Sequence, residues 1–505
     1  MEQNRLISKI IETMEISNIY IKYFINNAYL RILITSILLI YFNFSQAQIQ
    51  RTYKWYFGAN AGIDFSSNVA VADTNGMVNT WDGCATISDE SGNLLFYTDG
   101  STVWNRNHQI MPTGTGLMGH WSSHQNSIIV PKPASKTLFY IFTTDAQENN
   151  FQNGLRYSIV DMALDNGFGD VTSKNILLMA PTHEQLGATF HSNCNDIWVI
   201  THKRDEEKFY AFLVTENGIN PPVISEIGNA TQLLWGCFGF KISPNGTKIL
   251  SANFWDWYNT GIIDTVEIYE FNKNTGVLSN RKVLVGDTVN LMLSFSPDNN
   301  KIYVASGGIS DGIRIYQYDV NAADINLSKQ IVFETMENIF IYDAQHSPVS
   351  DELFLTNANS SYIPIIQNPN ASGVACNFID SAFYLNGKEC MTSFPNFISS
   401  YFDTDSATNC FLTNIEAKEI PKSLIPVFPN PAFNTNYITI KTNGIKITHI
   451  GLYSLTGKEV MIKQEFSEGQ IMLDISGIET GIYLLKLKDN DNNQIAVEKL
   501  VIQNK

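Results

Sequence analysis

Charged side chains are scarce in this chain of 505 residues, because Asp, Glu, Lys and Arg together make up only 16%. An average soluble domain has roughly 25%. Basic residues are the rarer sign: 33 Lys and Arg stand against 49 Asp and Glu, for a formal net charge of −16. A surface of this kind repels nucleic-acid phosphates and provides no electrostatic footprint for polyanions. We therefore expect no nucleic-acid partner.

Local signatures of catalysis and cofactor binding are also missing. The sequence contains no GxSxG, HExxH, GxGxxG or P-loop pattern. No two of its six cysteines form a CxxC pair, so a zinc or thioredoxin-type site lacks support. We predict no catalytic residue, no metal and no cofactor. Enzyme activity is less favoured but stays open, because residues from distant segments can assemble a site without a local motif.

The cysteines do not define a disulfide framework. In an oxidising compartment they can pair, and the sequence does not choose among the possible pairings. Three of them lie in apolar, strand-like runs, where a buried inert thiol is at least as well supported as a bridge. Those three are Cys84, Cys194 and Cys237, and the others are Cys376, Cys390 and Cys410.

Long hydrophobic runs are absent apart from residues 32–44, ILITSILLIYFNF. This run is too short to span a bilayer, which needs about 20 apolar residues. Arg31 precedes it and Ser45-Gln46-Ala47 follows, as in a secretory signal peptide cleaved after Ala47. We predict a signal peptide over residues 1–47, with Met14 as an alternative start, and no transmembrane segment in the mature chain.

Aromatic and turn-forming residues are abundant, with 22 Tyr, 30 Phe and 32 Gly. Aromatic and β-branched side chains fill pleated strands, whereas Gly, Asn and Asp form tight turns. The composition therefore favours an all-β fold.

One pattern returns between residues 48 and 402: a polar turn, then a short aromatic-rich strand, then a second hairpin. Each repeat thus contains about four strands in roughly 50 residues, which is typical of a β-propeller blade. Six repeats are visible, with turns and first strands at 88–99, 132–145, 191–203, 243–252, 296–306 and 347–358.

The two ends of this region, residues 55–65 and 396–402, are strand-like as well. We expect them to meet and complete a seventh blade, so that the ring closes between its first and last strands. Six blades with capping ends is the alternative.

The repeat ends at residue 402. Residues 403–424 are predicted to form a linker, and residues 425–505 a small β-sandwich of six or seven short strands.

The motifs FPNPAF (428–433), ITHIGLYSLTGKEV (447–460), LDISGIETGIYLLKL (473–487) and EKLVIQ (498–503) are recognisable in this order. Together they resemble the type A sorting domain of the Bacteroidetes type IX secretion system. The resemblance implies an Ig-like sandwich that the outer-membrane translocon and sorting machinery recognise. It also implies removal of the domain as the cargo is linked to surface lipopolysaccharide or released. The residues that it marks as the sorting motif are Pro429, Asn430, Pro431, Gly451, Tyr453, Gly457, Lys458, Gly481, Tyr483 and Lys486.

The repeat region is similar to extracellular WD40-like propeller proteins of the same bacteria. The similarity rests on residues 55–65, 83–117, 155–162 and 395–402. It implies a fold and a location but supplies no catalytic residues.

Two segments are candidate sites. His120 and His124, in GHWSSHQNS, have the spacing of metal ligands on a helix, but the surrounding Gly and Ser favour a loop and structural histidines. The aromatic segment FWDWYN (254–259) offers Trp255, Trp257 and Tyr258, which we select as ligand-binding residues for a sugar or a protein partner. Core packing against the next blade is the alternative for this segment.

These observations favour a secreted or surface-attached propeller that binds an extracellular glycan or protein. One alternative is an extracellular polysaccharide- or peptide-processing enzyme with residues dispersed over several blades. Another is a structural component of the cell surface or gliding machinery. A central funnel of Asp, Glu, His or Arg would indicate the enzyme, whereas an aromatic or flat polar face would indicate binding.

Overall fold

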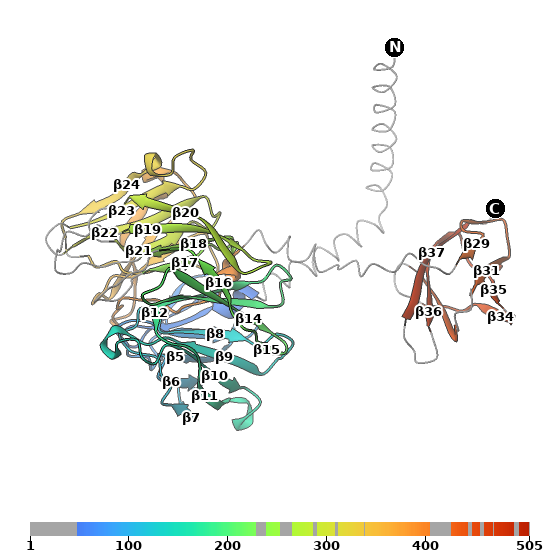
Figure 1. Ribbon diagram of the computed structural model, residues 1–505, viewed down its shortest axis with the longest axis horizontal. Coiled ribbons are helices and arrows are strands. Elements are labelled where there is room, and N and C mark those ends of the chain that lie inside the picture. The colour runs from blue at the N-terminus through green and yellow to red at the C-terminus, as the bar shows by residue number, and fades with distance from the viewer. Residues whose placement is uncertain are drawn as a thin grey trace, which may run out of the picture. The chain divides into compact units, whose positions relative to one another are not determined.

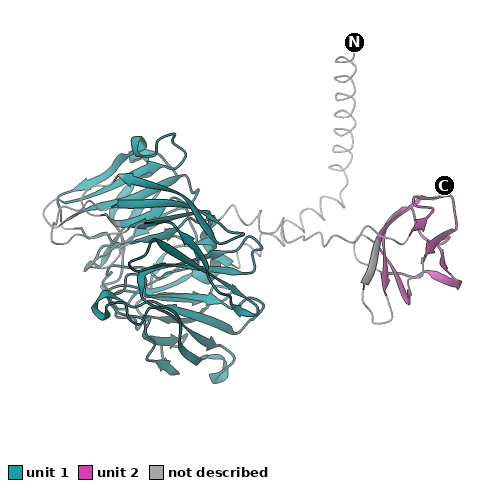
Figure 2. Ribbon diagram, viewed as in Figure 1, with its two compact units in different colours: residues 1–412 teal, residues 413–505 magenta. Residues whose placement is uncertain are grey.

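The computed structural model describes residues 48–228, 239–252, 265–285, 290–308, 312–337, 339–403, 426–442, 447–454, 459–467, 469–488 and 494–503. The chain divides into two compact units, Met1–Leu412 and Thr413–Lys505 (Figure 2). The predicted signal peptide, and the predicted linker apart from Asp403, lie outside the described residues.

The described part of the first unit forms seven antiparallel sheets in chain order, which we call blades 1 to 7 (Figure 1). Blade 1 has three strands, and each of the others has four or five. Blades 1 to 4 are β1 (Lys54–Phe57), β2 (Ala61–Asp64) and β3 (Val71–Ala72); β4 (Ala85–Ser88), β5 (Leu94–Thr98), β6 (Thr102–Asn105) and β7 (Ile110–Thr115); β8 (Ser127–Pro131), β9 (Leu138–Thr143), β10 (Leu155–Asp161) and β11 (Asp170–Met179); and β12 (Thr182–Phe190), β13 (Ile197–Lys203), β14 (Lys208–Thr215), β15 (Gly218–Ile219) and β16 (Val223–Glu226).

Blades 5 to 7 repeat the same order, in which each strand pairs with the next along the chain. Their strands are β17 (Phe240–Ile242), β18 (Lys248–Ala252), β19 (Thr265–Asn272) and β20 (Val277–Val285); β21 (Asn290–Phe295), β22 (Lys301–Gly308), β23 (Gly312–Asp319) and β24 (Gln330–Thr335); and β25 (Ala344–His346), β26 (Leu353–Leu355), β27 (Tyr362–Ile366) and β28 (Phe378–Tyr384).

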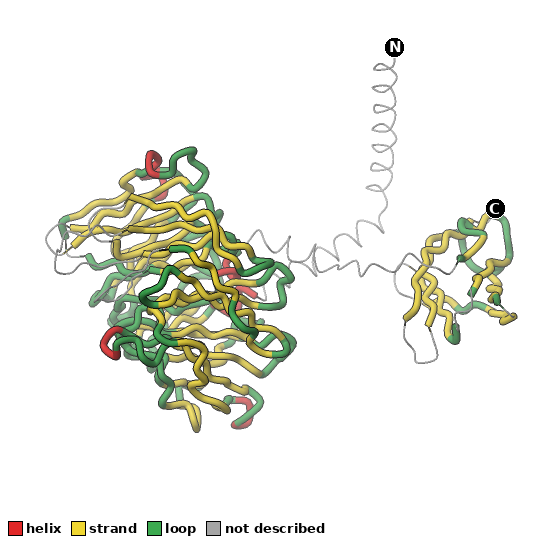
Figure 3. The backbone as a smooth tube through the Cα atoms, viewed as in Figure 1, coloured by secondary structure: helices red, strands yellow, loops and turns green. Residues whose placement is uncertain are grey.

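The described helices are all short 3₁₀ turns (Figure 3). They are η1 (Gln50–Thr52), η2 (Gln147–Asn149), η3 (Asp165–Gly167), η4 (Asn326–Ser328), η5 (Gly373–Cys376) and η6 (Ser399–Phe402). No helix in the described part of the chain is long and apolar enough to cross a membrane.

The predicted polar turns join the first and second strands of the blades. In the β4–β5 turn, Asp89 Oδ1 accepts hydrogen bonds from the Ser91 and Asn93 amides at 2.8 and 2.9 Å. Gly92 takes φ +82°, a conformation that glycine adopts without strain. The turn chemistry read from the sequence therefore sets where each inner strand ends.

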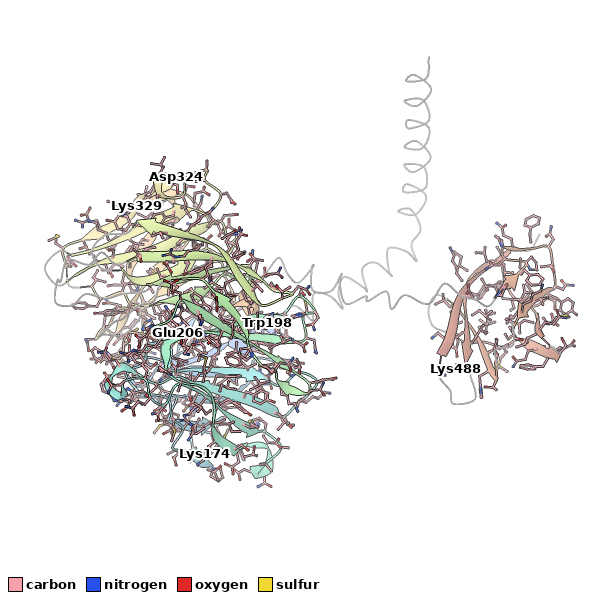
Figure 4. The ribbon with its side chains drawn as sticks, viewed as in Figure 1. Lys174, Trp198, Glu206, Asp324, Lys329 and Lys488 are labelled. Atoms are coloured by element: carbon pink, nitrogen blue, oxygen red, sulfur yellow. The ribbon has the colours of Figure 1, made fainter. Side chains whose placement is uncertain are left out.

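Side chains between successive blades form a closed ring of interfaces. Blade 1 packs on blade 2 through Tyr56 and Tyr97, whose ring centroids are 4.7 Å apart. Further buried clusters join the later blades in turn up to blade 7. Trp198, at the interface of blades 4 and 5, is one of these anchors (Figure 4). Phe354 of blade 7 then contacts Trp55 of blade 1 at 5.7 Å, which closes the ring. The fold is a β-propeller, as predicted, with seven blades.

The manner of closure differs from the prediction. Blade 1 consists of three strands that all come from the beginning of the propeller, and residues 396–402 add no strand to it. The two ends do meet, since the Ala59 amide donates to the Glu389 carbonyl at 3.0 Å. Beyond that point, however, the chain leaves the edge of blade 1 and follows the inner strands. Pro395 lacks an amide donor for a strand ladder, which gives a physical reason for this course.

The second unit is a β-sandwich of nine described strands, more than the six or seven expected. Two sheets, in the orders β29-β31-β35-β34 and β30-β37-β36-β32-β33, enclose one apolar core. The strands are β29 (Val427–Phe428), β30 (Ala432–Phe433), β31 (Tyr437–Lys441), β32 (His449–Ser454), β33 (Glu459–Val460), β34 (Lys463–Ser467), β35 (Gln470–Asp474), β36 (Gly481–Lys488) and β37 (Gln494–Gln503).

Trp55 provides a test of ring closure, because it is fully buried and contacts Phe65, Phe354, Phe394 and Phe397. We expect Trp55→Ala to lower the free energy of unfolding of the propeller by about 3–5 kcal/mol, as other buried aromatic truncations do. Urea denaturation measures this loss. Replacement of the exposed Trp121 by Ala is the matched control and should change stability by about 0.5 kcal/mol or less. Equal effects of the two changes would contradict closure through Trp55.

Candidate functional site

Residues 391–402, which we call the plug, run through the centre of the propeller. Parallel bridges join Pro395 to Cys84, next to β4, and Ile398 to Ala188 in β12. The Asn396 side chain donates to the Leu186 carbonyl at 2.9 Å, and the Phe190 amide donates to Ser400 Oγ at 3.2 Å. The plug therefore follows β12 from Leu186 to Phe190 and occupies the central channel.

The course of the plug distinguishes two faces of the propeller. The start face is the one at which the inner strands β4, β8, β12, β17, β21 and β25 begin, and the end face is the opposite one. The plug enters at the start face beside Asp82 and ends at the end face beside Phe190. Arg51, near the beginning of the propeller chain, forms an ion pair with Glu90 in the turn after β4 at 2.7 Å. Both ends of the propeller chain therefore emerge at the end face.

A buried polar cluster lies where the plug enters. Ser393 Oγ lies 3.1 Å from His124 Nδ1, and Asp82 Oδ1 lies 3.7 Å from the same nitrogen. Thr392 Oγ1 donates to Asp82, and the His124 amide donates to Glu184 Oε2 at 3.1 Å. Burial raises the pKa of the Glu184 carboxyl well above its usual range.

This cluster contains Ser, His and Asp, but its geometry is not that of a catalytic triad. Ser393 and Asp82 both face Nδ1 of His124, whereas a triad places nucleophile and carboxylate on opposite ring nitrogens. All three residues are buried, and Ser393 belongs to the plug itself. The cluster therefore anchors the plug.

A second anchor lies at β25, where Asp343 Oδ2 accepts the Phe394 amide at 3.0 Å. The other carboxylate oxygen of Asp343 forms an ion pair with Nζ of Lys241, a residue of β17, at 2.7 Å. The Gln345 side chain donates to the Pro395 carbonyl at 3.0 Å. Asp343 is thus bonded both to the plug and to Lys241.

Two tryptophans stand exposed on the start face, beside the point where the plug enters. Trp121 is 59% exposed and Trp81 is 43% exposed. Their backbones are held firmly: the Trp121 carbonyl accepts the Asp82 amide at 3.2 Å, and the Trp81 carbonyl accepts the Thr392 amide at 3.0 Å. The two rings therefore project from a fixed base, and we call them the tryptophan pair.

Polar side chains border the tryptophan pair. The His120 ring lies 5.7 Å from the Trp121 ring, and His120 Nδ1 lies 4.0 Å from Glu148 Oε2. Ser122 Oγ donates to Glu148 Oε1 at 2.6 Å. The Glu148 carboxylate is half exposed. An aromatic surface with an adjacent carboxylate and imidazole can stack on a ligand and also bond its hydroxyl or amide groups.

The segment GHWSSHQNS was singled out in the sequence for its histidines, whereas the tryptophan that forms the candidate site was missed. The segment is a loop, as predicted, with His124 buried and His120 at the surface. No group of three possible metal ligands occurs among the described side chains. A signal for the site was present, since Trp81 and Trp121 each precede small or polar residues shortly before an inner strand. The selected aromatic residues Trp255, Trp257 and Tyr258 lie outside the described residues.

Two stacked histidines lie deeper at the same face. The rings of His183 and His202 are 5.4 Å apart, and Phe209 packs on His202 at 4.5 Å. Within the described structure neither ring nitrogen of His202 has a hydrogen-bond partner. Burial lowers the pKa of His202 to about 4 and also lowers the pKa of His183.

One cysteine departs from its predicted environment. Cys194 lies in the turn between β12 and β13 at φ +60° and not in a strand, and it is disulfide-bonded, which is one of the two alternatives left open by the sequence. Cys84, Cys376 and Cys390 are free and buried. Burial raises the pKa of Cys390 to about 12, so this thiol is inert.

A cavity of about 410 Å³ opens on the end face. Its lining includes Ile49, Tyr53, Pro297, His346 and Phe402. It therefore lies where the two ends of the propeller chain emerge.

The sorting-motif residues in the second unit fall into two groups. Asn430 holds the terminal strand β37, because its side chain donates to the Lys499 carbonyl at 2.6 Å and accepts the Val501 amide at 3.0 Å. Tyr483 is buried and donates to the Glu479 carbonyl at 2.9 Å. These contacts stabilise the sandwich.

The other group lies on one sheet face. Gly451 leaves room for the Tyr453 ring, since a Cβ there would lie 2.6 Å from a ring carbon. Lys486 Nζ lies 4.7 Å from the centre of the same ring. Gly457 and Lys458 lie outside the described residues.

Comparison with known proteins identifies the second unit. Residues 426–503 match the family described as the secretion system C-terminal sorting domain, in agreement with the resemblance seen in the sequence. The chain is therefore a cargo of type IX secretion, which carries it to the cell surface or the extracellular space. No curated protein matches the chain.

Similarities to solved structures are at low identity. They include the Dos1 propeller, at 11% identity over 66% of this chain and 82% of that chain, with a TM-score of 0.40. A quinonprotein alcohol dehydrogenase-like protein from Bacteroides thetaiotaomicron has 13% identity over 69% and 78%, with a TM-score of 0.38. A putative 6-phosphogluconolactonase from Bacteroides uniformis has 12% identity over 82% and 97%, with a TM-score of 0.36.

The buried pair of histidines makes stability depend on pH. His202 is neutral in both states above pH 6.5, whereas between pH 6.5 and about 4 the unfolded chain binds a proton that the folded chain rejects. We expect this residue to remove about 3 kcal/mol of stability as the pH falls through that window, with no further loss below it.

Urea denaturation of His202→Leu at pH 8 and pH 4 measures the effect, and the variant should lose less stability than the wild type between these values. Phe209→Leu is the matched control, because it alters packing on His202 without removing a titrating group. It should lose as much stability between the two pH values as the wild type. An unchanged pH dependence in His202→Leu would contradict the assignment.

Proposed function

We propose that this type IX cargo is a surface-displayed or released binding protein, and that the tryptophan pair on its start face binds an extracellular glycan. One observation carries the proposal: two tryptophans are exposed, and their backbone carbonyls are hydrogen-bonded, that of Trp81 to Thr392 of the plug and that of Trp121 to Asp82. Exposed tryptophan is costly in water, and an anchored backbone loses little conformational entropy on binding. Both properties favour a binding site.

The surroundings favour a glycan over a protein partner. Protein-binding hot spots are enclosed by a ring of residues that excludes water. Here the rings are bordered by His120, Ser122 and the half-exposed Glu148, which suits a ligand that alternates C–H faces with hydroxyl groups. The polar groups around Trp121 thus match a sugar chain better than an apolar protein surface.

The enzyme alternative has less support. A funnel of charged groups at the central opening would favour it, and Asp82, His124 and Glu184 do gather there. All three are buried, however, and Asp82 and His124 are bonded to the plug, so a substrate does not reach these two without displacing it.

A glycan array probed with the mature protein tests the proposal. We expect Trp121→Ala and Trp81→Ala each to weaken binding of the recognised glycan by about tenfold or more, because each removes a stacking surface. Tyr384→Ala is the matched control, since Tyr384 is similarly exposed but pairs with Tyr362 on blade 7. Binding of a protein but no glycan would contradict the ligand class, and binding unchanged in both tryptophan variants would contradict the site. Release of a cleaved product would favour the enzyme.

Deletion of residues 425–505 tests the export route. Without the sorting domain the chain lacks the part that the type IX machinery handles, so it should accumulate in the periplasm. Fractionation followed by immunoblotting measures the distribution. The Trp121→Ala variant serves as the control and should be exported normally, and surface display of the deletion would refute the assignment.

A further inference from the structure

The plug contacts the propeller in the way that a bound peptide contacts its receptor. Its backbone amides donate hydrogen bonds to groups from different parts of the ring. Thr392 donates to the carbonyl of Trp81, Phe394 to the carboxylate of Asp343, and Asn396 to the carbonyl of Cys84 at 2.9 Å. The Gln345 side chain donates to the carbonyl of Pro395. Main-chain recognition of an extended segment is the usual basis of peptide binding.

Aromatic side chains of the plug fill pockets between the blades. Phe394 packs on Trp55 at 5.4 Å and on Phe57 at 4.9 Å. Tyr401 packs on Phe190 of β12 at 5.7 Å. Buried aromatic anchors of this kind provide most of the affinity in peptide and protein interfaces.

The plug fits closely around Asn396 and Phe397. The cavity that remains between Asn396, Phe397 and the inner strands β17 and β21 has a volume of only about 30 Å³. Before the plug, the chain is held at Glu389 and Cys390, which pair with Ala59 and Ser360. The turn that precedes these residues, around Asn386 and Gly387, is exposed.

We propose that the channel is a peptide-binding socket and that residues 389–402 are its ligand, supplied by the same chain. The ring and this segment then hold together through non-covalent contacts alone. The chain continues from Asp403, directly after the plug, to the sorting domain. Whatever binds the chain on the C-terminal side of Asp403 would therefore be connected to the propeller through the plug. This inference does not depend on the proposed glycan site.

A cut in the exposed turn tests the socket directly. A specific protease site inserted between Asn386 and Gly387 would separate the ring from the plug without touching either. The uncut variant reports whether the insertion permits folding. After cleavage of the folded protein, we expect the C-terminal fragment to co-elute with the ring on gel filtration in native buffer, and to separate only in denaturant.

A plug variant sharpens the test. Asn396→Ala removes the bond to the Leu186 carbonyl, so the cleaved fragment should dissociate about tenfold faster than in the unaltered cleaved protein. The matched control is Lys388→Ala in the turn outside the plug, which should leave the rate unchanged. Separation of the two pieces in native buffer immediately after cleavage would overturn the proposal. A fragment that stays bound and dissociates at the same rate in Asn396→Ala would overturn the assigned contact.

Discussion

Closure of the ring is the constraint on which the rest of this propeller depends. Each blade is hydrophobic on both faces and is stable only when both are covered. The last interface lies at Trp55, where blade 1, blade 7 and the plug meet in one aromatic cluster. Blade 1 has only three strands, and Phe394 and Phe397 of the plug pack on its Trp55.

The same arrangement explains the placement of the candidate site. The plug occupies the channel, and where it enters it is bonded to Asp82, His124 and Asp343. The hydrogen bonds at Thr392 and Asp82 also hold the two loops that carry Trp81 and Trp121. The plug therefore closes the channel and stiffens the surface beside it, while its far end leads towards the sorting domain.

Much of the fold was predictable from local chemistry. Turns such as the one at Asp89 recur with the blades, and the sorting motifs occur in order, so the two units followed from short segments. The way in which the ring closes could not be predicted from short segments. The plug has the aromatic spacing of a strand, and its hydrogen-bond partners are up to 311 residues away in the sequence. The exposure of Trp81 and Trp121 could not be predicted either, because the exposure of a loop side chain depends on how residues distant in sequence pack beneath the loop. The turn position of Cys194 likewise depends on its neighbours in space.

Amide hydrogen exchange of the mature protein tests the central claim most directly, because it reports the local stability of the plug backbone without any mutation. The account predicts that the amides of Thr392, Phe394 and Asn396 are protected as strongly as those of the inner strand β12. Exchange of these three amides at the rate of an unstructured tail, while β12 stays protected, would contradict it.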